Sequence, residues 1–139
     1  MVLLDTHVWV WSVEGDARRV GRRTSALLSR AQSQDDIRIS PATVFEIGAL
    51  HTAGRLRLAR SLEQWIHDAL AVAGVRLAPL SAAVAIDAGS IPRTSLADPL
   101  DRLLVATARQ LDATLLTSDT AILRYASQTA NVAVHDAGR

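Results

Sequence analysis

Short apolar segments alternate with helical segments along the whole chain of 139 residues, and no other feature limits its fold as strongly. The apolar segments at 2–4, 37–39, 75–80, 113–117 and 131–134 are predicted strands. Apolar strands separated by helices are typical of a parallel sheet that has helices on both faces. The sequence therefore predicts an α/β fold, formed by a single domain over residues 1–139.

The segments between these strands carry the start and stop signals of helices. We expect helices at 7–13, 18–32, 41–52, 62–72, 82–88, 100–111 and 120–126. Ser40-Pro41 and Asp98-Pro99 each combine a favoured N-cap residue with a proline at the first helical position. Glycines at 15, 54 and 74 close three of the helices.

Two residue types are missing, and their absence excludes several kinds of chemistry. The chain has no cysteine, and all fifteen basic residues are arginines. It therefore has no disulfide, no thiolate zinc site and no cysteine nucleophile. Without lysine it has neither a P-loop nor Schiff-base chemistry. The missing lysine also argues against receiver domains and haloacid-dehalogenase-type phosphatases, which normally carry one at an acidic site.

Nothing in the composition indicates a membrane protein. No run approaches the roughly 18 apolar residues that span a bilayer, and Asp5 comes too early for a signal peptide. We expect a cytoplasmic protein that does not contact membranes. The formal net charge of +1 does not by itself indicate a nucleic-acid binder.

Acidic residues stand where predicted strands end or where the neighbouring helices begin. Asp5 closes the first strand and Asp119 follows the fourth, while Asp98 and Asp101 open the helix before the fourth strand. In an open parallel sheet, function collects beyond the carboxyl ends of the strands. Each aspartate also has a purely structural interpretation, as an N-cap or as an acid in the first helical turn. That interpretation fits Asp98 best, because Pro99 marks it as the cap.

Glu46 is a different kind of candidate, because it lies in the middle of a predicted helix. Its neighbours three and four residues away are Ala42, Thr43, Ala49 and Leu50. A glutamate on that face points inward, where an ionised carboxylate is costly unless a partner compensates its charge. A buried pair with an arginine is the structural alternative.

Four converging carboxylates need a counter-charge. Two carboxylates about 4 Å apart repel by about 4 kcal/mol at an effective dielectric near 20. Four converging acids would therefore cost a large part of a small domain's net stability of roughly 5–15 kcal/mol. A cation removes the objection, and ligation by oxygen alone suits Mg²⁺ or Mn²⁺. Such ions hold phosphate oxygens, activate water and stabilise the leaving oxygen in phosphodiester cleavage.

These acids belong to four motifs that stand in order along the chain. The motifs are 3–11 (LLDTHVWVW), 40–47 (SPATVFEI), 98–108 (DPLDRLLVATA) and 116–119 (LTSD). Together they resemble the motifs of the PIN-domain ribonucleases, and in particular those of the VapC toxins of bacterial toxin–antitoxin pairs. The resemblance implies a PIN-like fold, a homodimer and inhibition by a cognate VapB-type antitoxin. It implies contact with DNA only indirectly, through that antitoxin.

The resemblance also implies an Mg²⁺-dependent endoribonuclease activity, with Mn²⁺ as a substitute, and a set of site residues. The family's acidic quartet matches Asp5, Glu46, Asp101 and Asp119, and its small hydroxyl positions match Thr117 and Ser118. Asp98 belongs to the Asp-Pro-x-Asp-Arg variant of the third motif, and positions three apart share a helix face. Both aspartates are therefore candidate ligands, and we rank Asp101 first because Asp98 serves as the cap.

The sequence thus predicts the metal-dependent RNA-cleaving toxin of a type II toxin–antitoxin pair. Asp5 and Asp101 are the principal predicted metal ligands, while Glu46 and Asp119 complete the acidic site and orient the attacking water. Asp98 and Asp119 are further candidate ligands. Two alternatives remain open at this point. One is a metal-dependent phosphatase acting on small phosphate esters, and the other is a non-enzymatic phosphoacceptor or binding module with an acidic pocket.

Basic and aromatic residues outside the acidic quartet give weaker signals. Within the predicted helix 18–32, an arginine doublet is repeated one turn later, and its members are Arg18, Arg19, Arg22 and Arg23. Arginine forks match phosphate oxygens, so this stripe is a candidate RNA-binding edge, with a solvated helix face as the alternative. Arg102 could orient a site carboxylate, meet a phosphate or form a plain ion pair.

The three tryptophans and His7 lie in apolar settings. We expect Trp9, Trp11 and Trp65 in core or dimer packing rather than as base-stacking platforms. His7 stands beside Val8, and we expect it to be a hydrogen-bonded structural residue rather than a general base.

Overall fold

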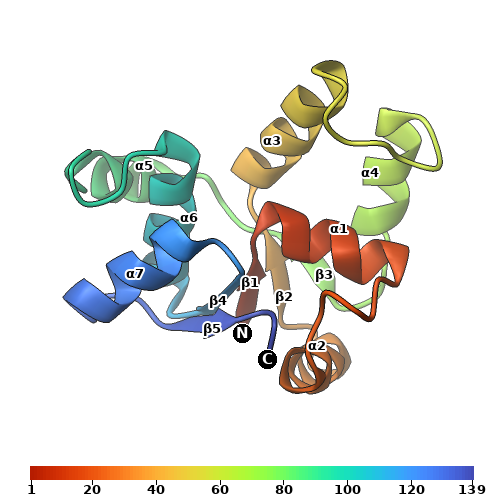
Figure 1. Ribbon diagram of the computed structural model, residues 1–139, viewed down its shortest axis with the longest axis horizontal. Coiled ribbons are helices and arrows are strands. Elements are labelled where there is room, and N and C mark those ends of the chain that lie inside the picture. Colours follow the sequence, from red (N-terminus) through yellow and green to blue (C-terminus); the bar gives the residue numbers. More distant parts are fainter.

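The computed structural model describes residues 1–139 and contains one five-stranded parallel sheet (Figure 1). The strands are β1 (Val2–Leu4), β2 (Ile37–Ile39), β3 (Val75–Leu77), β4 (Thr114–Thr117) and β5 (Val134–Asp136). Their order in the sheet is β3-β2-β1-β4-β5, and every neighbouring pair is parallel. The predicted α/β class is confirmed.

Helices connect the strands and cover the sheet. They are α1 (Thr6–Glu14), α2 (Arg22–Ser33), α3 (Pro41–Thr52), α4 (Leu62–Leu70), α5 (Ala82–Gly89), α6 (Pro99–Leu111) and α7 (Thr120–Thr129). In Figure 1, α5, α6 and α7 gather on one side of the central strands, and α1, α3 and α4 on the other. None of the helices has the length and apolar character that crossing a bilayer requires.

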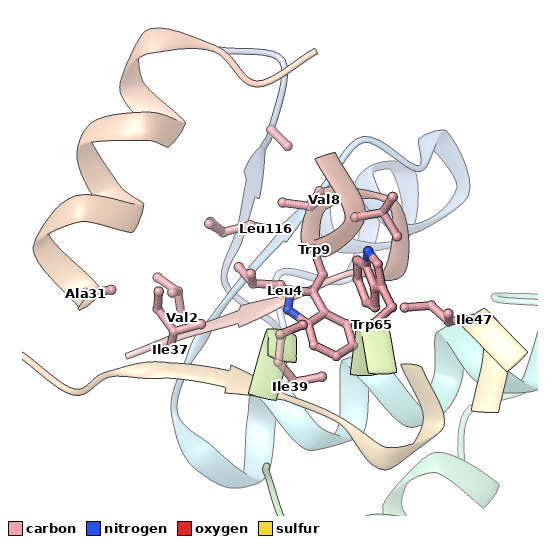
Figure 2. Close-up of a cluster of buried hydrophobic side chains, with 13 residues drawn as sticks. Val2, Leu4, Val8, Trp9, Ala31, Ile37, Ile39, Ile47, Trp65 and Leu116 are labelled. Carbon is pink, nitrogen blue, oxygen red and sulfur yellow. The ribbon is translucent and has the colours of Figure 1, made fainter. Parts of the chain in front are cut away.

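Two hydrophobic cores lie on opposite faces of the sheet, because successive side chains of a strand point in opposite directions. Val2 and Leu4 of β1 belong to one core, and Leu3 between them belongs to the other. Trp9 and Trp65 lie in the first core, where their rings meet edge to face with 5.2 Å between the centroids (Figure 2). The predicted packing role of these two tryptophans is confirmed.

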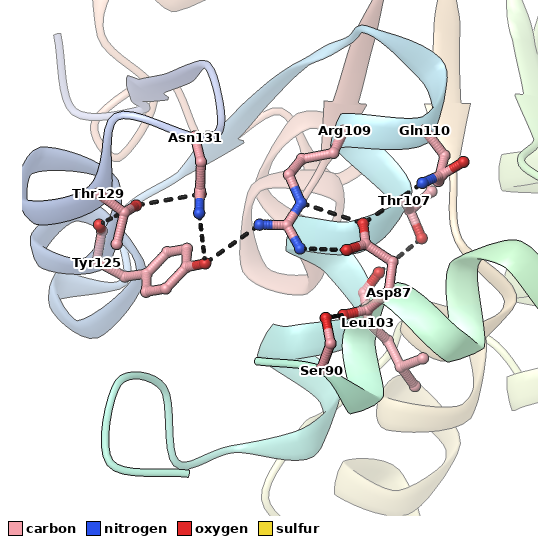
Figure 3. A network of polar contacts seen from close by, with 9 residues as sticks. All are labelled: Asp87, Ser90, Leu103, Thr107, Arg109, Gln110, Tyr125, Thr129 and Asn131. Carbon is pink, nitrogen blue, oxygen red and sulfur yellow. Dashed lines mark hydrogen bonds and ion pairs between the residues drawn. The ribbon is translucent and has the colours of Figure 1, made fainter. Parts of the chain in front are cut away.

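The second core is reinforced by a polar network that joins three helices (Figure 3). Arg109 of α6 donates to both carboxylate oxygens of Asp87 in α5, from Nη2 to Oδ1 at 2.5 Å and from Nε to Oδ2 at 3.1 Å. Its Nη1 also donates to the Tyr125 hydroxyl of α7 at 3.2 Å, and Asn131 donates to the same hydroxyl at 3.0 Å. The network therefore fixes α5 and α7 against α6.

Two predicted elements are misplaced along the chain. The helix expected at 18–32 begins only at Arg22, because Gly21 is its N-cap and bonds through its amide to the Ala137 carbonyl at 2.9 Å. The strand expected at 131–134 lies instead at Val134–Asp136. Most other boundaries agree within one or two residues. The exceptions are β3, which stops three residues early, and α7, which runs three residues longer than expected.

Candidate active site

The strand order places two acidic strand ends side by side. From β1 the chain adds β2 and β3 on one side of the sheet, and β4 and β5 lie on the other side. The carboxyl ends of β1 and β4 therefore flank a point where the strand order reverses, the usual place for a ligand site in an open α/β sheet. Asp5 directly follows β1, and Ser118 and Asp119 directly follow β4.

An open cleft of about 400 Å³ lies at this point and is lined by all the predicted catalytic residues except Thr117. Its lining consists of five carboxylates, one histidine, one tryptophan and one serine: Asp5, Glu46, Asp98, Asp101, Asp119, His7, Trp11 and Ser118. The starts of α1, α6 and α7 and the middle of α3 supply the acids. No arginine lines the cleft, so its carboxylates have no guanidinium partner there.

Thr117, at the end of β4, joins two of these acids from below the cleft. Its buried hydroxyl donates to Asp5 Oδ2 at 2.6 Å and accepts from the Asp119 amide at 3.0 Å. The other oxygen of Asp5 accepts from the Thr6 amide at 2.7 Å, so Asp5 is also the N-cap of α1. Hydrogen bonds thus fix Asp5 in position, while burial raises the pKa of its carboxyl against the opposing effect of these bonds.

Asp101 differs from the other aspartates because no group in the protein compensates its charge. Its residue is 9% exposed, and its carboxylate has neither a hydrogen bond nor an ion pair. Burial, followed by the charges of Asp119, Asp98, Asp5 and Glu46, raises the pKa of Asp101 to about 8. Without a bound cation, the folded protein therefore holds a proton on this group near neutral pH.

Glu46 and Asp98 occupy the two sides of the cleft with different local roles. Glu46 is partly exposed and forms no ion pair, so the alternative of a buried pair with an arginine is wrong. Asp98 is exposed and caps α6 by accepting from the Leu100 amide at 2.8 Å. Asp98 therefore has a structural task that Asp101 lacks.

The donor set suits a hard divalent cation, because it offers carboxylate oxygens and no sulfur. Burial above all raises the pKa values of Asp5 and Asp101, the neighbouring carboxylates add to the rise, and a cation bound among these acids would lower both pKa values. As the side chains stand, no three acidic or histidine groups come close enough together to enclose an ion. Mutual repulsion favours that separation, and a cation would remove it. The residues therefore fit Mg²⁺ or Mn²⁺ in their chemistry.

The predicted arginine stripe does not exist as one helix face. Arg18 and Arg19 lie in a turn before α2, whereas Arg22 and Arg23 form its first turn. None of the four lines the acidic cleft. Arg102 lies beside a separate hollow of about 240 Å³ between α5 and α6, where its buried Nε has no hydrogen-bond partner.

Sequence reasoning missed two residues of the cleft. His7 is exposed and makes no hydrogen bond, so its expected role as a hydrogen-bonded structural residue is wrong. Trp11 packs against the first core but also lines the cleft. One signal was available, because His7 and Trp11 are four residues apart on a helix that starts at Asp5 and so share a face near that acid.

Residues 2–128 match the family model of the PIN domain. The chain belongs to the PIN-domain family. Within that family it is of the VapC type, since it is 31% identical over 119 residues to ribonuclease VapC22 of Mycobacterium tuberculosis (strain ATCC 25618 / H37Rv). The match covers 85% of this chain and 86% of that protein.

Solved structures show the same fold over nearly the whole chain. FitAcB from Neisseria gonorrhoeae matches with a TM-score of 0.62 and 27% identity, over 98% of this chain and 97% of that chain. VapBC2 from Rickettsia felis, solved with a DNA fragment from its promoter, matches with a TM-score of 0.68 and 17% identity. That match covers 97% of this chain and 98% of the other, so the PIN-like fold extends over both.

Proposed function

We propose that the protein is a Mg²⁺- or Mn²⁺-dependent endoribonuclease that acts in the cytoplasm as the toxin of a type II toxin–antitoxin pair. The observation that carries the proposal is the cleft in which Asp101, with a pKa of about 8, faces four other carboxylates. Similarity to VapC22, which is named a ribonuclease, supports the activity, and membership in the VapC type supports a VapB-type antitoxin as partner.

Asp5 and Asp101 are the principal residues that would hold the cation, with Asp98 and Asp119 as further candidates. The ion, when bound, supplies positive charge to the phosphate and lowers the pKa of water. Asp119 caps α7 through Oδ1, so its Oδ2 is available to accept a hydrogen bond from the attacking water. Glu46 would accept a second one. Thr117 keeps Asp5 in place through its hydroxyl, and Ser118 offers a further hydroxyl at the cleft.

RNA cleavage with and without divalent ions tests the proposal. Chelation should abolish the cleavage of single-stranded RNA, and either Mg²⁺ or Mn²⁺ should restore it. Release of phosphate from a small ester should stay at background under the same conditions. Full cleavage in excess chelator would contradict the metal mechanism, and phosphate release without RNA cleavage would favour a phosphatase.

The same cleft defines what an inhibitor should look like. Five carboxylates without an arginine attract a basic segment, because charge complementarity steers and holds a partner. We expect the C-terminal part of a VapB-type antitoxin to cross the cleft and place an arginine or lysine near Asp5 or Asp101. A structure of the inhibited complex checks this, and an antitoxin that inhibits while leaving the cleft open would refute it.

A homodimer belongs to the same proposal. Phe45 of α3 and Ile86 of α5 are 66% and 74% exposed, the highest values among the large apolar side chains. Exposed apolar side chains of this size are candidate contacts of a self-association surface. Sedimentation should give twice the monomer mass, and Phe45→Glu or Ile86→Glu should reduce it.

A further inference from the structure

Trp11 is the one tryptophan that is not enclosed by the core. Trp9 and Trp65 are only 1% and 4% exposed, whereas Trp11 is partly exposed and lies at the edge of their cluster. Among the eight residues that line the acidic cleft, Trp11 is the only hydrophobic one. A large aromatic surface therefore stands in a cleft whose other side chains are polar or charged.

The surroundings of Trp11 extend beyond the acids. A second hollow, of about 270 Å³, lies between α1 and α2. Its lining is mixed: Ser25, Ser29 and Gln32 lie beside apolar side chains such as Leu28 and beside the carboxylate of Asp16. Trp11 is the only residue that lines both hollows. A chain-like ligand that leaves the acidic cleft along this path must therefore pass the indole ring.

Two side chains beside the Trp11 ring, Arg19 and His7, have the chemistry to contact a nucleotide. The Arg19 guanidinium lies over one face of the Trp11 ring, its carbon 5.5 Å from the ring centroid, and the Arg19 side chain is 62% exposed. A cation–π contact at such an exposed site is weak, and it must open when a base stacks on that face. The ion pair of Arg19 with Asp16 is at the surface and contributes little, so the guanidinium remains able to bind a phosphate. The His7 ring centroid lies 6.0 Å from that of Trp11, and His7 also lines the acidic cleft.

We propose that Trp11 is a stacking platform for one base of single-stranded RNA, adjacent to the phosphate that the acidic cleft receives. The inference rests on the proposed ribonuclease function and specifies its substrate, because only an unpaired base can expose its face to an indole ring. Arg19 would contact a backbone phosphate on the α2 side of Trp11. A volume of about 400 Å³ falls within the roughly 300–1,000 Å³ of small-ligand sites and admits a single nucleotide unit beside the acids.

Binding of a labelled oligoribonucleotide of unpaired sequence tests the proposal without cleavage. It is measured by fluorescence anisotropy with Mg²⁺ present, each variant being placed in the cleavage-deficient Asp101→Asn background so that the carboxylates do not repel the phosphate. Trp11→Leu keeps an apolar side chain but loses the π-face, and we expect its Kd to rise about tenfold. Trp11→Phe should stay within about threefold of wild type, since it retains an aromatic face. Val13→Ala on the same helix, which does not line the acidic cleft, is the matched control and should leave Kd unchanged.

An abasic scan of the oligoribonucleotide identifies the stacked base. One position should weaken binding to wild type but not to Trp11→Leu, because the partner of that base is already lost. If Trp11→Leu fails to fold, acrylamide quenching of wild-type tryptophan emission serves instead, since Trp9 and Trp65 are buried and saturating RNA should protect the accessible component. Unchanged Kd in Trp11→Leu, an abasic scan without such a position, or unprotected emission overturns the proposal.

Cleavage assays separate this inference from the function on which it rests. If wild type cleaves RNA and Trp11→Leu binds it equally well, only the platform is refuted. If wild type neither binds nor cleaves RNA, the proposed function fails as well. Loss of antitoxin binding in Trp11→Leu with unchanged RNA affinity would assign the ring to the antitoxin and also overturns the platform.

Discussion

Three aspartates of the cleft combine a structural task with their place at the site. Asp5, Asp98 and Asp119 are the N-caps of α1, α6 and α7. The sequence predicted this for Asp98 and offered it as the structural alternative for Asp5 and Asp119. A capping role therefore does not exclude a ligand role. Asp101 is the informative case at the scale of single residues, because it is buried and makes no compensating contact. In the metal-free protein a proton on the carboxyl removes the cost of burying its charge, and a bound cation would take over that compensation.

The difference between Asp98 and Asp101 gives the first prediction. Asp98→Asn should keep the cap on the Leu100 amide, because asparagine caps as well as aspartate, and should retain much of the nuclease activity. Asp101→Asn should lose nearly all of it, by about 100-fold or more. Initial rates of RNA cleavage at saturating Mg²⁺ provide the comparison. The reverse order of losses would make Asp98 the ligand.

Thr117 gives a second prediction at the same scale. Thr117→Val removes the hydroxyl that donates to Asp5 and accepts from the Asp119 amide, at nearly constant volume. Cleavage should fall about tenfold, which corresponds to about 1.4 kcal/mol of transition-state stabilisation. Thr117→Ser should restore most of the rate.

Thr107→Val is the matched control for this change. Thr107 is equally buried, but its hydroxyl bonds only to the Leu103 carbonyl within α6. We expect its variant to melt lower or unchanged and to cleave RNA at the wild-type rate. Equal rates for Thr117→Val and wild type would show that Asp5 needs no fixed position.

At the scale of elements, the sequence predicted those helix starts that depend on hydrogen bonds between neighbouring residues. The Ser40-Pro41 and Asp98-Pro99 caps start α3 and α6 as expected, because their hydrogen bonds involve only neighbouring residues. The start of α2 could not be predicted in this way. It depends on Gly21 meeting the backbone of Arg139 and the Ala137 carbonyl, which are remote in sequence.

The same distinction applies to the candidate site. Acids at strand ends were predictable, since parallel strands bring their carboxyl ends to one edge and the motifs mark the positions. Trp11 was predictable in part, since it shares a helix face with His7 near Asp5, but its place in the cleft also depends on how α1 leaves β1, which periodicity does not encode. For the same reason the arginine doublets at 18–19 and 22–23 looked like one helix face, although a turn separates them.

The network around Arg109 gives a prediction for the packing of α5, α6 and α7. Arg109→Leu leaves Asp87 without its bidentate partner in a partly buried position, where the two side chains are 19% and 22% exposed. The free energy of unfolding should fall by about 1–3 kcal/mol. Arg60→Leu, which breaks the exposed pair with Asp68, should cost less than about 1 kcal/mol. Urea unfolding midpoints compare the two, and equal shifts would assign no special role to the network.

At the scale of the whole molecule, the small net charge conceals a strong separation of charge. The formal value is +1, yet five carboxylates share one cleft that no arginine lines. Total charge therefore says little about this protein's ligands, and the local field is the relevant quantity. Because that field is repulsive without a cation, it should be visible in the stability of the metal-free protein.

The last prediction uses the pH dependence of that stability. The pKa of Asp101 is raised to about 8 in the folded state, so between about pH 4 and 8 the folded protein keeps a proton that the unfolded chain has lost. The free energy of unfolding should therefore fall as pH rises through this window, by at most about 1.4 kcal/mol per pH unit from this group. Asp5, whose pKa is also raised, adds to the same trend.

Asp101→Asn replaces the titrating carboxyl by a neutral amide of nearly the same shape. The variant therefore lacks the repulsion between an ionised Asp101 and the other carboxylates, and we expect it to be more stable than wild type at high pH. In chelator at pH 8 the variant should melt higher than wild type, by about 5 °C, and its melting temperature should depend less on pH. Millimolar Mg²⁺ should raise the melting temperature of wild type more than that of the variant, because stabilisation by a ligand follows its affinity for the folded state. If Asp101 were only a structural residue, the variant would melt lower and Mg²⁺ would act equally on both proteins. Melting curves at about pH 5 and about pH 8, near the two ends of the window in which Asp101 keeps its proton, decide between these outcomes when they are recorded with chelator and with Mg²⁺.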